Sequence, residues 1–274
     1  METVAASDTP RKYKLGIALS GGGARGFAHI GVLKALEEYG IFPDLISGVS
    51  AGSVVGGLYC AGFSPADMIE IFQGEHFKDF AEIRVPKVSL FSTLGFREFL
   101  SRSIGKRIFS ELELPFMVIA TDIDHGESVV FNKGIVADAI WASCSIPVIF
   151  QPVEIDGVHY VDGGVLRNFP VYPIRHLCDY VIGVDVNTLK LAPYKANILN
   201  IAERSYNLMF RSNTTEDKKL CDLLIETNET ADYNIFDLKH IESIASLGYQ
   251  VTVNILEKLK KENRLPPSVH HPIS

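Results

Sequence analysis

The sequence has few cysteines, no excess of basic residues and no long hydrophobic run. Its four cysteines, Cys60, Cys144, Cys178 and Cys221, lie far apart and form no C-x-x-C pair. This spacing argues against a zinc module and against a thioredoxin-type redox motif. We therefore expect buried free thiols in a reducing compartment.

The charge balance and the lack of apolar runs exclude further classes. With 26 lysines and arginines against 33 aspartates and glutamates, the net charge is −7, which argues against a nucleic-acid partner. The first residues, METVAASDTPRKYK, lack the apolar core of a signal peptide, and no run reaches the about 18 apolar residues of a membrane span. We therefore expect a soluble, cytoplasmic protein, with a disordered or extended segment at residues 1–13 and a tail at 265–274.

Glycine, by contrast, is concentrated near the N-terminus. Twelve of the 22 glycines fall in the first 62 positions, and only Gly183 and Gly248 follow Gly164. Glycine is favoured where the backbone takes a positive φ or where another group must approach it closely. The first quarter of the chain is therefore where we expect a site.

Strands and helices alternate along the chain. Apolar runs typical of strands occur at residues 14–20, 44–49 and 180–186, and helical patterns occur at residues 27–39, 51–61 and 241–259. Two hairpins are expected as well, at 116–131 and at 153–161, the second around an Asp156-Gly157 pair that suits a type I′ turn. The alternation predicts an α/β fold of three layers, α/β/α, with a mostly parallel central sheet. Because no repeat or linker interrupts the pattern, we expect one domain over residues 14–264.

The first glycine turn stands between a strand and a helix. Its residues GGGARG, with Gly21, Gly22, Gly23 and Gly26, match G-x-G-x-x-G, but the second strand is not followed by the acidic residue that a dinucleotide site would use. The turn does offer a row of backbone N–H groups at a helix N-terminus, which can stabilise a phosphate or an oxyanion. A non-catalytic nucleotide- or lipid-binding module that uses this loop is therefore one alternative.

The second turn carries a nucleophile pattern. Gly48, Ser50 and Gly52 form G-x-S-x-G between a strand and a helix. In a nucleophile elbow the serine takes a strained conformation, and glycines two residues away on either side avoid clashes with strand and helix. Ser50 is therefore the candidate nucleophile.

A serine nucleophile needs a base, and Asp162 is the candidate. It ends a hairpin strand and precedes Gly163 and Gly164, which would let a substrate or another backbone approach. Taken alone, Asp-Gly-Gly is more typical of a turn. Its distance from Ser50 in the sequence decides nothing, because catalytic partners are neighbours in space.

Four motifs in this order, GGGARG, GVSAG, ASCSIP at residues 142–147 and DGG, resemble the patatin-like phospholipase family in its compact bacterial form. The resemblance implies a patatin-like fold and a Ser-Asp dyad without histidine. It also implies an oxyanion hole from the glycine loop, no metal, no cofactor and a phospholipid or lysophospholipid substrate. A lipid substrate is consistent with peripheral membrane contact, and the family permits a homodimer. The implied roles are nucleophile for Ser50, base for Asp162, oxyanion donors for Gly21, Gly22 and Gly23, and loop support for Arg25, with Gly48, Gly52, Gly163 and Gly164 completing the motifs.

A histidine-dependent esterase or thioesterase is the other alternative. A triad in the order Ser, Asp, His would have to use His176, His240, His270 or His271. None of them stands in a convincing loop at a strand end. His29 is interpreted as a packed helix residue behind the glycine loop, with loop positioning as its alternative role.

Other polar residues have weaker signals. Asp122 and Asp124 flank a turn beside His125, where turn formation is favoured over metal binding because a third spaced ligand is missing. Asp185 ends the predicted strand at 180–186, where it could orient loops near the carboxyl edge of the sheet.

Residues 78–107 form a candidate lid or insert. They hold seven basic and three acidic residues, a local charge of +4, and half of the 16 phenylalanines lie between Phe72 and Phe116. Such a mixture suits an anionic lipid surface, with Phe91 and Phe96 entering it. The competing interpretation is an insert whose phenylalanines pack on the core.

Overall fold

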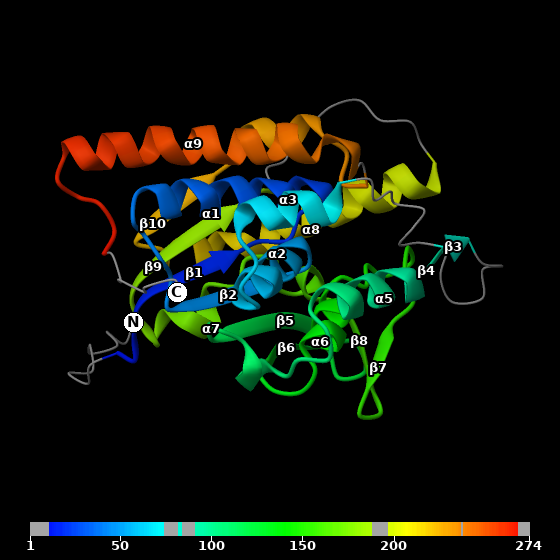
Figure 1. Cartoon of the computed structure of the whole chain (residues 1–274). Helices are drawn as coiled ribbons and strands as arrows, with labels where there is room; N and C mark the ends of the chain where they lie inside the picture. Colours follow the sequence, from blue (N-terminus) through cyan, green and yellow to red (C-terminus); the bar gives the residue numbers. More distant parts are fainter. Residues whose placement is uncertain (1–10, 74–81, 84–90, 188–196, 237, 268–274) are drawn as a thin grey trace, which may run out of the picture.

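The computed structural model describes residues 11–73, 82–83, 91–187, 197–236 and 238–267 (Figure 1). The strands are β1 (Tyr13–Leu19), β2 (Leu45–Val49), β3 (Glu82–Ile83), β4 (Phe91–Ser92), β5 (Phe116–Asp122), β6 (Glu127–Phe131), β7 (Val153–Ile155), β8 (Val158–Asp162), β9 (Cys178–Asp185) and β10 (Leu223–Glu226). The helices are α1 (Ala28–Glu38), α2 (Ala51–Cys60), α3 (Pro65–Phe72), α5 (Leu94–Ser103), α6 (Val136–Ser143), α7 (Tyr172–Arg175), α8 (Ile198–Lys218) and α9 (Ile241–Lys261). Short 3₁₀ helices are η1 (Gly23–Phe27), η2 (Phe109–Glu111), η3 (Gly163–Val165), η4 (Asn228–Asp232) and η5 (Leu238–His240).

The central sheet of the described chain has the strand order β10-β9-β1-β2-β5-β8-β7, with β6 also paired to β5. The strands from β10 to β5 are parallel to one another, whereas β6, β7 and β8 add antiparallel pairs at one side. The predicted three-layer α/β fold with a mostly parallel sheet is therefore confirmed. Parallel strands bring their carboxyl ends to one edge, and ligands of such sheets collect there.

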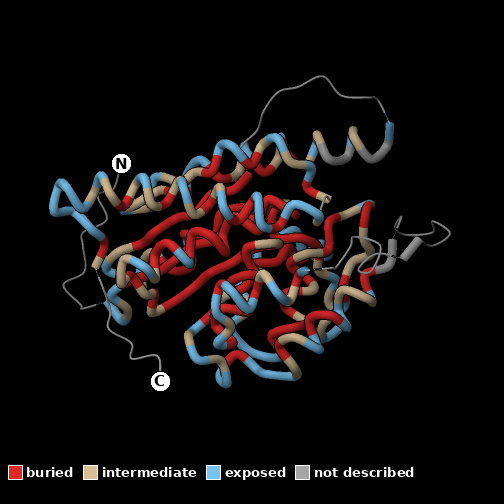
Figure 2. Tube along the Cα trace, turned by 45° about the horizontal axis from the view of Figure 1, so that its top comes forward, coloured by how far each residue is buried: buried red, intermediate tan, exposed pale blue. Residues whose placement is uncertain are grey.

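Helices cover both faces of this sheet, as the alternation of buried residues on β1 requires. Leu15 and Leu19 belong to the large buried cluster shared with α1, α2 and α9, while Ala18 belongs to a second cluster with Phe169 and with Ile174 of α7. Figure 1 shows α1 and α9 together on one side of the sheet, and Figure 2 shows that the central strands are buried along their length. The result is a core on each side of a buried sheet.

Both predicted hairpins are present. β5 pairs with β6, and β7 pairs with β8 through a turn in which Asp156 has φ 53° and Gly157 has φ 80°. Positive φ at both central residues is the signature of the predicted type I′ turn. No helix or strand was predicted between residues 187 and 240, where α8 and β10 lie.

The predicted insert at 78–107 is described in part. β3 pairs antiparallel with β4, and α5 follows, while residues 78–81 and 84–90 lie outside the described residues. Phe99 of α5 is buried, and the half-buried ring of Phe96 lies 6.3 Å from it, centroid to centroid. These two phenylalanines pack on the core, as the insert interpretation expects; nothing is described of the Phe91 side chain.

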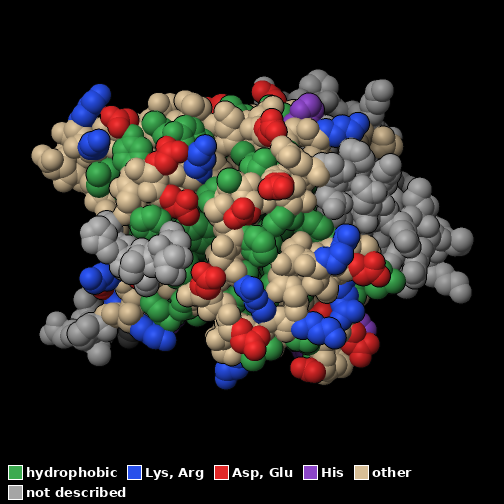
Figure 3. All heavy atoms as spheres, viewed as in Figure 1, with side chains coloured by type: hydrophobic (Ala, Val, Ile, Leu, Met, Phe, Trp, Pro, Cys, Tyr) green, Lys and Arg blue, Asp and Glu red, His purple; other side chains and the backbone are tan. Residues whose placement is uncertain are grey.

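The surface and the thiols complete the outline. On the face drawn in Figure 3, basic and acidic side chains are interspersed rather than gathered by sign.

The four cysteines are free thiols, with Cys60 and Cys178 buried and Cys144 and Cys221 half-buried. None of the helices in the described ranges has both the length and the apolar character needed to span a membrane.

Candidate active site

Ser50 stands on a sharp turn between β2 and α2. Its backbone has φ 50° and ψ −125°, a left-handed conformation that is strained for a serine. A Cβ at Gly48 would come within 2.5 Å of the Gly52 carbonyl oxygen, and one at Gly52 within 2.2 Å of the Leu19 carbonyl oxygen. The two glycines therefore permit the close contact that an elbow needs.

A buried serine holds this elbow in place. The Ser50 N–H donates to the hydroxyl oxygen of Ser143 at 2.8 Å, and that hydroxyl donates to the Ile119 carbonyl oxygen at 2.6 Å. Ser143 lies at the end of α6 and is fully buried. The sequence analysis did not single it out, although it lies inside the ASCSIP segment that carries the resemblance.

Strand register brings Asp162 to the same place. Val49 is level with Ile119 on β5, and Ala120, the next residue, is level with Asp162 on β8. Adjacent strands lie about 4.8 Å apart, so Ser50 and Asp162 are separated by roughly two strand spacings, a distance that two side chains can bridge. Two residues far apart in the sequence thus become neighbours across the sheet.

The Asp162 carboxylate is completely buried. Its Oδ1 accepts a hydrogen bond from the Gly164 N–H at 2.7 Å, whereas no described group meets ordinary hydrogen-bond geometry with Oδ2. Burial raises the pKa of Asp162 to about 6, and the nearby Ser50 hydroxyl and the Gly164 N–H oppose this rise. A carboxyl group with a pKa in this range can exchange a proton with a neighbouring hydroxyl near neutral pH.

The glycine loop approaches Ser50 from β1. A Cβ at Gly21 would lie 3.1 Å from the Ser50 Cβ, and Gly23 lines the same cavity as Ser50. The Gly21 N–H donates to the Asn168 carbonyl oxygen at 3.2 Å. Within the described residues, the N–H groups of Gly22 and Gly23 have no hydrogen-bond partner, so they remain available to a ligand.

Arg25 supports this loop from behind. Its Nη1 donates to Asn187 Oδ1 at 3.1 Å and its Nε to the Tyr233 carbonyl oxygen at 3.0 Å. Asp185 in turn accepts from the Asn187 N–H at 2.9 Å and pairs with the Lys218 ammonium at 2.6 Å. A buried polar chain thus connects α8 and the end of β9 to the glycine loop.

Two asparagines join the glycine loop to the Asp162 loop. Asn168 Nδ2 donates to the Gly21 carbonyl oxygen at 3.3 Å, and its backbone N–H donates to Asn213 Oδ1 at 2.9 Å. Asn213 Nδ2 donates to the Gly164 carbonyl oxygen at 2.8 Å. Neither asparagine was expected from the sequence, because both act through contacts between segments that are distant along the chain.

Ser50 opens into an apolar cavity of about 140 Å³. Its walls come from η1, α2, the end of α3, α5, the loop after α6 and the segment around η5. The lining side chains are almost all apolar and include Phe27, Val54, Phe72, Phe96 and Phe150. Such a lining suits a hydrocarbon chain.

The candidate histidines lie elsewhere. His176 is exposed just before β9 begins, whereas Ser50 directly follows the end of β2. Because β9 and β2 run in the same direction, His176 and Ser50 lie at opposite edges of the sheet. His240 is exposed at the start of α9 and does not line the cavity, and His270 and His271 lie outside the described residues. His29 is buried, and its Nε2 contacts the Ser20 carbonyl oxygen at 2.9 Å.

Asp122, Asp124 and His125 form a turn. Asp122 Oδ1 accepts from the Asp124 and His125 N–H groups at 3.0 and 2.9 Å, and the His125 ring contacts Oδ2 at 2.8 Å. Among the residues that the structure describes, no group of three His, Cys, Asp or Glu side chains is placed to hold a metal ion.

Comparison with known proteins identifies the family of this chain. A sequence profile of the family described as patatin-like phospholipase matches residues 17–174. An uncharacterized NTE family protein of Mycobacterium bovis is 33% identical over 221 residues, which covers 77% of this chain and 59% of that protein. The lysophospholipase NTE1 of Cryptococcus neoformans is 27% identical over 290 residues, which covers 92% of this chain but 18% of that protein. The chain thus spans less than two thirds of the length of these relatives.

A solved structure shares the fold. VipD from Legionella pneumophila superposes with a TM-score of 0.59 at 14% sequence identity, covering 90% of this chain and 67% of that one. At this identity the likeness concerns the fold alone.

Proposed function

Because the chain belongs to the patatin-like phospholipase family, we propose that it is a serine acyl hydrolase acting on phospholipids or lysophospholipids. The observation that carries the proposal is the strained Ser50 beside the buried Asp162 at the head of an apolar cavity. The fungal relative named as a lysophospholipase supports the lipid substrate. Residues 14–264 are the proposed acyl hydrolase domain.

The first half of the proposed reaction forms an acyl-enzyme. Asp162 takes the proton of the Ser50 hydroxyl while Oγ attacks the ester carbonyl carbon. The negative charge that develops on the carbonyl oxygen is stabilised by the N–H groups of Gly22 and Gly23, with Gly21 shaping the loop and Arg25 holding it. The leaving alcohol then takes the proton from Asp162, and the acyl group stays on Ser50.

The second half releases the fatty acid. Asp162 takes a proton from a water molecule, the resulting hydroxide attacks the acyl-enzyme carbonyl, and Ser50 recovers its proton from Asp162. Each oxyanion donor is worth about 2.7–4 kcal/mol in comparable enzymes, so the glycine loop would contribute as much as the base. The proposed steps use only side chains, backbone N–H groups and water.

An apolar rim supports contact with a lipid surface. Val148 is 55% exposed and stands between Ile146 and Phe150, which line the cavity, and Leu94 is 40% exposed directly after the lining residue Thr93. Exposed apolar side chains at the mouth of a hydrocarbon pocket suit a membrane interface. Peripheral contact with the membrane is part of the proposal.

Fatty-acid release from phosphatidylcholine and lysophosphatidylcholine tests the proposal. We expect release by the native protein and its loss in Ser50→Ala and in Asp162→Asn. Full activity of Asp162→Asn would show that Asp162 is not the base. If the native protein released fatty acid from neither lipid, the proposed substrate class would be contradicted.

A further inference from the structure

An aromatic wall lines one side of the cavity. Phe72, the last residue of α3, is buried and lines the cavity. Its ring packs edge-on against Phe27 at 5.2 Å and lies tilted by 40° against Phe99 at 5.3 Å, centroid to centroid. Phe72 is thus clamped between two rings and cannot swing aside without disturbing both.

The cavity extends only a short way along α2 from the proposed nucleophile. It follows α2 from Ser50 to Val54 and Val55, which is about one helical turn or 5.4 Å. Leu58, on the next turn, is fully buried in the core and does not line the cavity. The cavity therefore borders α2 over little more than one turn.

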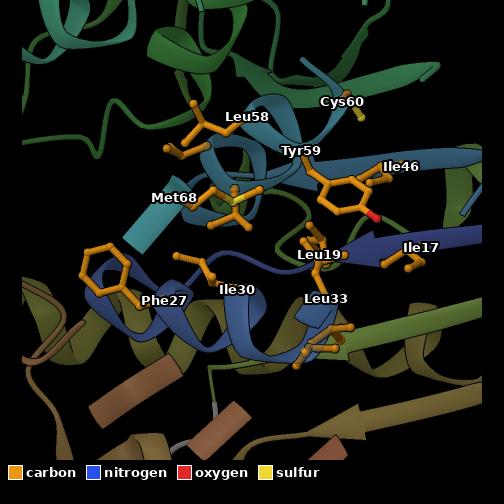
Figure 4. Close-up of a cluster of buried hydrophobic side chains, with 14 of the residues drawn as sticks. Ile17, Leu19, Phe27, Ile30, Leu33, Ile46, Leu58, Tyr59, Cys60 and Met68 are labelled. Atoms are coloured by element: carbon orange, nitrogen blue, oxygen red, sulfur yellow. The ribbon is translucent and has the colours of Figure 1, made fainter. Parts of the chain in front are cut away.

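The core beside the wall is filled. Met68 lies one turn before Phe72 on α3, is fully buried, and belongs with Phe27 and Ile30 to the buried cluster shown in Figure 4. Within the described residues, this close packing leaves a longer acyl chain no space along α3 at Met68. The volume of about 140 Å³ is similar to that of a cavity that holds one benzene molecule, so it accommodates roughly six carbon atoms.

From this geometry we infer that Phe72 sets the length of the acyl chain that the site accepts, an inference that rests on the proposed hydrolase function. The substrate class is an ester of a medium-length fatty acid, whose first carbons lie along Val54 and Val55 and end against Phe72. Longer chains are disfavoured because they must bend back toward the mouth, where part of their apolar surface stays in water.

Phe109 offers a matched control. It is buried to a similar degree in the same hydrophobic core, but its ring packs on Phe116, 6.1 Å away, and it does not line the cavity. Phe72→Ala lengthens the cavity, whereas Phe109→Ala removes a core ring that packs on Phe116 instead. Because either alanine variant can lose stability, Phe72→Leu and Phe109→Leu provide a milder pair. Val54→Leu acts in the opposite direction, since it adds a methylene inside the cavity.

The experiment compares kcat/KM for p-nitrophenyl hexanoate and p-nitrophenyl dodecanoate. One methylene in a hydrophobic pocket changes specificity about 10–200-fold. We therefore expect the dodecanoate-to-hexanoate ratio to rise roughly tenfold or more in Phe72→Ala, to rise less in Phe72→Leu and to fall in Val54→Leu. The ratio should stay within about twofold of the native value in Phe109→Ala and Phe109→Leu, whatever their thermal stability.

Two results separate the failure of this inference from that of the proposed function. If the native protein hydrolyses the esters through Ser50 but the Phe72 variants keep the native ratio, or shift it no more than the Phe109 variants, the role of Phe72 is refuted and the hydrolase function stands. If the native protein hydrolyses neither ester, or if Ser50→Ala retains full hydrolysis, the proposed function is refuted, and the inference about Phe72 is refuted with it.

Discussion

The Ser143 hydroxyl lies 2.8 Å from the Ser50 backbone nitrogen and accepts its hydrogen bond. The same hydroxyl donates to β5 at the Ile119 carbonyl oxygen, 2.6 Å away. An elbow residue with φ 50° has no regular secondary-structure partner for its N–H, and here a side chain from α6 supplies one. The conformation of the proposed nucleophile therefore depends on a buried residue that does not line the cavity.

Removing this hydroxyl should disturb the elbow. In Ser143→Ala the buried Ser50 N–H and Ile119 carbonyl both lose their partner, at a cost of roughly 1–3 kcal/mol in the free energy of unfolding. We expect kcat for a soluble ester to fall about ten- to a hundredfold, with little change in KM, because a small displacement of the nucleophile lowers reactivity strongly. Steady-state kinetics and urea unfolding measure the two effects.

Ser145→Ala is the matched control. Ser145 is equally buried and lies in the same segment, but its hydroxyl donates to the Trp141 carbonyl oxygen and does not reach Ser50. We expect a comparable loss of stability and nearly native kcat. Equal kcat in the two variants would contradict the positioning role of Ser143.

The activity should titrate with Asp162. Burial raises the pKa of this carboxyl group to about 6, and only the ionised form can accept the Ser50 proton. As pH falls through about 6 the carboxylate becomes protonated, so kcat/KM should decrease about tenfold for each pH unit below that value. A pH profile with a soluble ester measures this. A rate that stays constant down to pH 4 would contradict the assignment of Asp162 as base.

The fold could be predicted where its signals are local. The Asp156-Gly157 pair predicted the type I′ turn because both residues tolerate the positive φ that this turn requires. Gly48 and Gly52 predicted the elbow around Ser50 because a Cβ at either position would clash with the backbone. The α8 helix was missed for a physical reason. It buries polar residues such as Asn207, Thr214 and Asp217 while the apolar Ile201 and Leu208 are exposed, so its apolar residues do not mark its buried face.

The site could be predicted only in part, because several of its features arise from contacts between segments that are distant along the chain. The motifs pointed to Ser50 and Asp162, but the register across β2, β5 and β8 that makes them neighbours cannot be read from their spacing. Asn168 and Phe72 gave no signal of their own. Their importance comes from what packs beside them: the glycine loop for Asn168, and the Phe27 and Phe99 rings for Phe72.

His29 should make the fold sensitive to acid. Burial lowers its pKa to about 4, and the hydrogen bond to Ser20 and the charge of Asp185 only partly oppose this. In the unfolded chain the imidazole titrates near 6.5, so the unfolded state binds more protons between these values and stability falls as pH drops from 6.5 to 4. The loss approaches about 3 kcal/mol at the acid end.

His29→Gln tests this because glutamine keeps a hydrogen-bond donor but does not titrate. Urea unfolding of both proteins across this pH range should show that the stability advantage of the native protein shrinks toward acid. Taking the difference between the two proteins cancels the opposite contribution of Asp162. A difference that does not change with pH would show that His29 is not the responsible group.

The exposed Val148 should serve lipid contact rather than stability. It has φ 70°, a conformation that is costly for a β-branched residue, and is 55% exposed beside the cavity. Asparagine tolerates this conformation, so Val148→Asn should raise the free energy of unfolding by about 1 kcal/mol. It should also lower hydrolysis of lipid in vesicles while hydrolysis of a short soluble ester stays near native.

Leu220→Asn is the control for that surface. Leu220 is 37% exposed just after α8, near the start of β10 and thus at the sheet edge opposite Ser50. Its replacement should leave vesicle hydrolysis unchanged. If Leu220→Asn and Val148→Asn reduce vesicle hydrolysis equally, the rim has no specific role.

Covalent labelling tests the central claim most directly. A fluorophosphonate reacts with an activated serine, so the account predicts that the native protein forms one adduct, which peptide mass spectrometry locates on Ser50. Asp162→Asn should label much more slowly, and Ser50→Ala should not label. An adduct on another residue, or native-like labelling of Ser50→Ala, would contradict the assignment of Ser50 as the nucleophile.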